Sequence, residues 1–261
     1  MRNTGIAAIL AFLIATTVRA NDVTDGVNRY ADDAKHLALA PLQWDATQWT
    51  RFGDAVGVVA VFYAADQKLA TDVQRHRTSS TNRVARDITP FGASRALEIS
   101  TLMVAGGAIL RNTTLSEAGR DSLESEIWAA GIVTPLLKRA FGRARPIQER
   151  GAHSFHPFSS TYESFPSGHA TNVFAFATAI AAHSEGWIVP TIVYSMAAGV
   201  AAARVNDRAH FPSDVVAGAL IGRAVARGVV ALHPHSRTTL NIAPAIVGHR
   251  PALVFSLCAA R

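Results

Sequence analysis

The chain has 261 residues, and 49% of them are hydrophobic, which is enough apolar material for one large core or two modest ones. Its formal net charge of +6 weakly favours anionic partners, but no basic stripe with interleaved aromatic residues is present, so nucleic-acid binding is not supported. Cys258 is the only cysteine, which excludes an intrachain disulfide. Without internal repeats or low-complexity tracts, we expect a single main domain.

The N-terminus has the pattern of a secretory signal peptide, predicted to span residues 1–20. Arg2 supplies the positive start, Gly5 to Thr17 forms a short apolar core, and Val18-Arg19-Ala20 places small residues at the two critical cleavage positions. We therefore predict an exported, periplasmic protein. The alternative is an uncleaved anchor in an integral inner-membrane protein, although the apolar core is short for a span.

Six segments of the main body, predicted as a domain over residues 21–235, have helical patterning. They are about 54–72, 94–110, 122–140, 168–183, 187–204 and 214–232. The prediction is an all-α fold, a helical bundle of about six core helices. Most charge-free stretches are shorter than a membrane span, with Gly186 to Ala203 as the exception, and Arg223 and Arg227 would be costly at mid-membrane. A soluble or peripherally bound protein is thus favoured over a six-span one.

The last segment, predicted as a tail over residues 236–261, changes character. Leu240 to Pro244 and Ala252 to Leu257 alternate or run apolar, and Gly248 to Pro251 has turn composition between them. This pattern predicts a short C-terminal β-hairpin packed on the bundle.

Three polar blocks stand out within the helical region. They are Lys138-(six residues)-Arg145-Pro146, Pro166-Ser167-Gly168-His169 and Arg204-(five residues)-His210-(three residues)-Asp214. Together they supply three cations, two imidazoles and a carboxylate, the set needed to hold a phosphate and transfer it through a histidine. Each block alone is a weak signal, but ten fixed positions in order are a strong one.

The second block begins a predicted helix that is suited to binding an anion. Ser167 is a plausible N-cap for the apolar run Ala170 to Ala182, and Gly168 lets a phosphate approach the backbone closely. Free N–H groups at the helix start then point at the anion. In the third block, Asp214 lies four residues after His210, so its carboxylate can hold one ring nitrogen and leave the other free to attack phosphorus.

These three blocks resemble the signature of the type-2 phosphatidic acid phosphatase superfamily, which also contains bacterial acid phosphatases and vanadium haloperoxidases. The resemblance is close over about residues 125–232. It departs at Ala203, where the family usually has serine before the arginine. A lost neutral hydrogen bond is worth about 1 kcal/mol, so we expect weakened support for the site and not its loss.

The resemblance implies a metal-independent phosphatase, without a cofactor, that hydrolyses phosphomonoesters or pyrophosphates through a phosphohistidine. Its expected partner is a phosphorylated small molecule or a lipid such as phosphatidic acid or a prenyl pyrophosphate, met at a membrane surface. The resemblance also implies the catalytic roles: His210 is the nucleophile, Asp214 its orienting partner and His169 the general acid. The implied phosphate-binding residues are Lys138, Arg145, Ser167, Gly168 and Arg204.

Two alternative functions stay open. A vanadium haloperoxidase would hold vanadate on His210, but the chain is short and the gap from Arg145 to Pro166 is compact; bromide oxidation with added vanadate would identify it. A non-catalytic family member is the second alternative, favoured slightly by Ala203 and opposed by the intact histidines.

The remaining charged and aromatic residues near the blocks are given simpler assignments. Arg139 and Arg143 fall off the pattern and are predicted to be surface or membrane-interface charges. Four histidines without partner spacing are predicted to be structural: His183, His233, His235 and His249. The loop between the first two blocks is rich in rings, which either pack it onto the bundle or form an apolar wall for a lipid chain. These rings are His153, Phe155, His156, Phe158, Tyr162 and Phe165.

Overall fold

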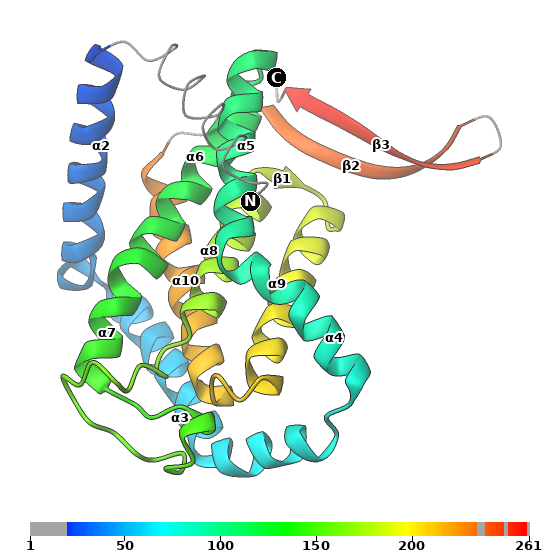
Figure 1. Cartoon of the computed structure of the whole chain (residues 1–261). Coiled ribbons are helices and arrows are strands. Elements are labelled where there is room, and N and C mark those ends of the chain that lie inside the picture. Colours follow the sequence, from blue (N-terminus) through cyan, green and yellow to red (C-terminus); the bar gives the residue numbers. More distant parts are fainter. Residues whose placement is uncertain (1–19, 234–237, 248–249, 260–261) are drawn as a thin grey trace. The chain divides into compact units, whose positions relative to one another are not determined.

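A computed structural model of the chain describes residues 20–233, 238–247 and 250–259 (Figure 1). These residues form two compact units, of which the first ends at Gln43 and the second begins at Trp44. The described part of the first unit consists of α2 (Ala20–Leu39) and a 3-10 turn, η1 (Ala40–Gln43). The predicted signal peptide lies outside the described residues except for Ala20, so its cleavage and the predicted domain boundaries stay predictions.

The second unit is a helical bundle, which confirms the predicted all-α fold class. Its helices are α3 (Ala46–Arg75), α4 (Ser79–Ile88), η2 (Thr89–Gly92), α5 (Ser94–Leu110), α6 (Thr113–Glu126), the π-helical η3 (Ile127–Val133), α7 (Thr134–Phe141), η4 (Pro146–Gln148), α8 (Gly168–Ala182), α9 (Ile188–Asn206) and α10 (Pro212–Leu232). The six predicted segments correspond to α3, α5, the α6–η3–α7 series, α8, α9 and α10.

The helix α4 was not predicted, because it is short and mostly polar, although the few apolar residues it has lie on one face. Its local signal is a capping box, in which the Thr78 hydroxyl accepts from the Thr81 N–H and the Thr81 hydroxyl accepts from the Thr78 N–H. A similar box between Asp45 and Gln48 begins α3 well before the predicted start. Capping therefore sets helix boundaries that hydrophobic periodicity misses.

The close packing of α8 against α10 positions the functional residues, and the two helices run side by side in Figure 1. Two glycines of α10 make this approach possible. A Cβ atom on Gly218 would lie 2.5 Å from the Ser167 carbonyl oxygen, and one on Gly222 would lie 2.2 Å from that of Thr171. The first turn of α10 is consequently held against the start of α8, where the Ser167 N–H donates to the Asp214 carbonyl oxygen at 2.9 Å.

The C-terminal segment forms the predicted β-hairpin. Strands β2 (Thr238–Val247) and β3 (Arg250–Ala259) are antiparallel, with Leu240 opposite Leu257. The hairpin joins the rest of the second unit through β1 (Ser184–Glu185), which pairs in parallel with β2 just after α8. Of the predicted turn residues, Gly248 and His249 lie outside the described residues.

Two of the described helices, α9 and α10, are long and apolar enough to cross a membrane. The bent pair formed by residues 79–92 and 94–110 passes the same test if it counts as one span. α10 passes this test even though it contains Arg223 and Arg227, which we expected to be costly in a membrane. These helices support the membrane alternative more than the predicted soluble protein.

Candidate active site

The three sequence blocks converge at one end of the bundle, where α8 and α10 begin and α7 and α9 end. The interactions of His169 demonstrate this convergence. Burial, together with the charges of four predicted site residues, lowers the pKa of His169 to about 4; the four residues are Arg204, His210, Lys138 and Arg145. Because Coulomb interactions weaken with distance, these four side chains must all lie near the His169 ring.

The start of α8 has the predicted cap geometry. Ser167 is fully buried, and its hydroxyl accepts from the Ala170 N–H at 3.5 Å. A Cβ atom on Gly168 would stay 3.7 Å from the Thr134 methyl group and 3.9 Å from Lys138 Cε, which is ordinary contact. The packing of the protein itself could thus accommodate a side chain at Gly168.

Of the three predicted cations, Lys138 lies beside this helix start, and all three act electrostatically on His169. Lys138 donates to the Glu163 carbonyl oxygen, and burial, assisted by the charge of Arg145, lowers its pKa to about 8. Arg204 has a buried Nε atom with no hydrogen-bond partner among the described residues, and its Nη1 lies 3.7 Å from Asp207 Oδ2. A buried guanidinium N–H needs an acceptor, and a phosphate oxygen would be a suitable one. Ala203, the departure from the family pattern, is buried.

His210 is buried and held in a single tautomer. Its Nδ1 lies 2.7 Å from the Ser164 carbonyl oxygen, which can only accept, so Nδ1 must carry the proton and Nε2 has the free lone pair. Burial lowers the pKa of His210, against the opposing effect of Asp214, and this favours the neutral ring. The side chain therefore has the protonation state that a nucleophile needs.

Asp214 lies beside His210 but is not within hydrogen-bond distance of Nδ1. The distance from its Oδ2 to His210 Nδ1 is 3.7 Å, which is too long for a hydrogen bond. That oxygen instead accepts from the Ser164 hydroxyl at 2.5 Å and the Phe211 N–H at 2.8 Å. Asp214 thus positions His210 through Ser164, a residue that sequence reasoning missed because a loop serine two residues before the second block carries no distinctive signal.

The prediction for Arg143 was wrong. Arg139 is exposed as expected, but the Arg143 side chain is fully buried and donates to Asp214 Oδ1 and to Asp66 Oδ2, both at 2.6 Å. Its guanidinium also lies 4.5 Å from the centroid of the Phe211 ring. The α7 helix ends at Gly142, which has a φ of +56° and no room for a Cβ atom, so Arg143 no longer follows the helical periodicity of Arg139.

The ring-rich loop is mostly packed onto itself and the bundle. Phe155 lies 6.0 Å from Tyr63 and beneath the Arg143 guanidinium, and Phe141 packs edge-on against Phe165 at 4.9 Å. Ring contacts also join His153 to Tyr63 and His156 to Tyr162. Phe158 differs, with 80% of its surface exposed, and of the six rings it is the best placed to meet a lipid chain.

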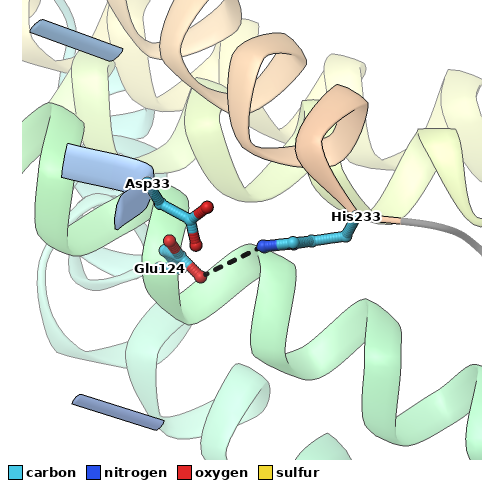
Figure 2. A group of neighbouring side chains, drawn as sticks. All are labelled: Asp33, Glu124 and His233. Atoms are coloured by element: carbon cyan, nitrogen blue, oxygen red, sulfur yellow. Dashed lines mark ion pairs between the residues drawn. The ribbon is translucent and has the colours of Figure 1, made fainter. Parts of the chain in front are cut away.

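The other ends of α8 and α10 carry two of the histidines predicted to be structural. His183 and His233 lie 2.9 Å and 2.7 Å from the two oxygens of Asp121, and His233 Nε2 lies 3.9 Å from Glu124 in the ion pair drawn in Figure 2. A helix as long as α8 places them roughly 22 Å from the convergence of the three blocks. His235 and His249 lie outside the described residues.

Comparison with known proteins gives matches to one family. The PAP2 superfamily model matches residues 125–237. A lipid A 1-phosphatase from Rhizobium johnstonii is 46% identical over 97 residues, which cover 36% of this chain and 39% of the relative. A lipid A 1-phosphatase from Rhizobium etli is 45% identical over 97 residues, covering 36% and 41%. The chain thus matches only about two fifths of the length of these curated relatives.

Two crystal structures share the fold. The Aquifex aeolicus LpxE structure has a TM-score of 0.51 and 21% identity, covering 64% of this chain and 94% of that one. The transmembrane PAP2-type phosphatidylglycerolphosphate phosphatase from Bacillus subtilis has a TM-score of 0.55 and 22% identity, covering 69% and 94%. The matched segment 125–237 carries all three blocks, so this part of the chain is similar to the PAP2 superfamily.

Proposed function

We propose that this protein is a metal-independent lipid phosphatase that hydrolyses a phosphomonoester or pyrophosphate through a phosphohistidine at His210. The observation that carries the proposal is the geometry of His210: Nδ1 donates to a carbonyl oxygen, so the Nε2 lone pair is free within a site that contains three cations. Lys138, Arg145 and Arg204 supply the positive charge that phosphoryl transfer needs around the phosphate oxygens.

The reaction has two steps. The His210 Nε2 lone pair forms a bond to phosphorus while the bond to the leaving oxygen breaks, and His169 gives that oxygen its proton. Water then attacks phosphorus, His169 takes a proton from the water, and the N–P bond breaks to release phosphate. The pKa of His169, about 4 in the free site, must rise for the first step, and a bound phosphate anion beside the ring would raise it.

A lipid substrate is supported by the apolar helices and by the relatives. Helices α9 and α10 are apolar enough to cross a membrane, and the two curated relatives carry the name lipid A 1-phosphatase. We therefore place lipid A 1-phosphate beside phosphatidic acid and a prenyl pyrophosphate as candidate substrates. Export through the predicted signal peptide would put the reaction in the periplasm or at the membrane surface facing it.

The proposal is tested by phosphate release from the full chain in detergent micelles. The substrates are a soluble aryl phosphate, phosphatidic acid, lipid A 1-phosphate and a prenyl pyrophosphate, each in EDTA with and without vanadate. We expect EDTA-resistant turnover that vanadate blocks, together with an acid-labile phosphoenzyme after rapid quenching. Turnover that EDTA abolishes, or turnover without any trapped phosphohistidine, would contradict the mechanism.

Deprotonation of Lys138 should cause the fall of kcat/KM on the alkaline side of the pH profile. Lys138 has a pKa of about 8 in the free site, so its charge is present below that pH and is lost as the pH rises through it. We expect kcat/KM for the aryl phosphate to fall above about pH 8. In Lys138→Arg the guanidinium stays charged, so the fall should move to higher pH. An unchanged alkaline limb in this variant would assign it to another group.

A further inference from the structure

Asp66 is a buried charge that the proposed reaction does not use directly. Among residues 46–75 of α3, all of which the structure describes, it is the one buried side chain, and its exposed fraction is 0%. A carboxylate removed from water is strongly unfavourable unless charges and hydrogen bonds compensate it. The burial of this acid, on a helix with no other buried side chain, therefore requires an explanation.

The contacts of Asp66 all lead to the first turn of α10. Its Oδ1 accepts from the Ser213 N–H at 2.8 Å, and its Oδ2 accepts from the Ser213 hydroxyl and from Arg143 Nη2. Arg143 Nη1 in turn donates to Ser213 Oγ at 2.7 Å and to Asp214 Oδ1 at 2.6 Å. The side chains of Asp66, Arg143 and Asp214 are all fully buried, so water does not screen these contacts.

This arrangement connects α3 to the reacting histidine through a continuous series of contacts. Arg143 holds one oxygen of Asp214, and the other oxygen of Asp214 holds the Ser164 hydroxyl. The Ser164 carbonyl oxygen accepts from His210 Nδ1. A substitution at Asp66 should consequently alter the position of the His210 ring, although the two residues do not contact each other directly.

The charges of the series favour the same conclusion. When His210 attacks phosphorus it becomes a positively charged imidazolium, which a negative charge nearby stabilises. Arg143 alone beside Asp214 would cancel that carboxylate. Because Arg143 is shared with Asp66, the two carboxylates and one guanidinium leave one net negative charge behind the His210 ring.

We propose that Asp66 is a positioning residue for the His210 reaction: together with Arg143 it fixes Asp214 and Ser164 behind the imidazole and preserves the negative charge there. The proposal rests on the phosphatase function proposed above. It predicts that Asp66 affects the rate of phosphoryl transfer and not the affinity for phosphate, because the three cations that bind the anion are not held by Asp66.

The decisive variant is Asp66→Asn, which preserves size and removes the charge. We expect kcat and the rapid-quench rate of phosphoenzyme formation to fall about 10²-fold, the size of effect that a small displacement of a reacting group produces. The inhibition constant of inorganic phosphate should stay within about twofold of the wild-type value. Calorimetry with inorganic phosphate counts the binding sites, and this count gives the folded fraction of protein by which kcat is normalised. Asp72→Asn is the matched control, because Asp72 is a half-exposed carboxylate of the same helix.

A second variant separates positioning from folding. Ser213→Ala retains both charges and their direct contact but removes the hydroxyl that bonds to both Asp66 and Arg143, and it should lower kcat about tenfold at unchanged phosphate affinity. The proposal is overturned if Asp66→Asn turns over at the wild-type rate per phosphate-binding site, or if phosphate affinity falls in step with kcat. Failure of the wild-type protein to form a phosphoenzyme would instead refute the proposed function, and this inference with it.

Discussion

Replacing His210 by alanine should lower kcat about 10⁵- to 10⁶-fold, the usual consequence of removing a catalytic nucleophile, and should abolish the trapped phosphoenzyme. The reason is geometric: a carbonyl acceptor holds Nδ1, which leaves the Nε2 lone pair free to attack phosphorus. The measurement is phosphate release from the best substrate under EDTA, combined with rapid-quench labelling.

The control for this variant is His76→Ala, because His76 is an exposed histidine at the end of α3, remote in sequence from all three blocks. It should retain wild-type turnover. If the His210 variant kept more than about 1% of the wild-type turnover and still formed a phosphoenzyme, the nucleophile would have to be another residue.

Replacing Arg143 by methionine should destabilise the protein by about 3–5 kcal/mol, because it leaves the buried carboxylates of Asp66 and Asp214 without their shared cation. We expect the thermal unfolding midpoint to fall by roughly 10 °C. Arg139→Met is the matched control on the neighbouring, exposed arginine, and its effect should stay within about 0.5 kcal/mol.

Combining Arg143→Met with Asp66→Asn tests the cause of this destabilisation. If the unpaired Asp66 carboxylate accounts for part of it, the double variant should lose less stability than the sum of the single losses. Strict additivity, or equal losses in the Arg143 and Arg139 variants, would contradict a buried ion network at this position.

Sequence alone determined the features that depend on neighbouring residues. The periodicity of apolar residues identified α5, α8, α9 and α10 with nearly correct ends, and the alternating tail identified the hairpin. The three blocks identified the residues that surround His169, and the Ser167 cap followed from its place before an apolar run. These signals are local because helix hydrogen bonds, caps and turns join residues a few positions apart.

Only the tertiary structure decided how the histidine is supported. Arg143 meets Asp66 across 77 positions and Asp214 across 71, and His210 meets Ser164 across 46. Arg143 reads as a surface charge because it falls off the pattern of the first block, and Asp66 lies within a predicted helix where no motif singles it out. Their burial follows from the close approach of α10 to α8 and from the chain reversal at Gly142. A charged residue takes such a role only when tertiary packing removes it from water. That packing brings together residues that are far apart in the sequence, and a local sequence pattern does not reveal such pairs.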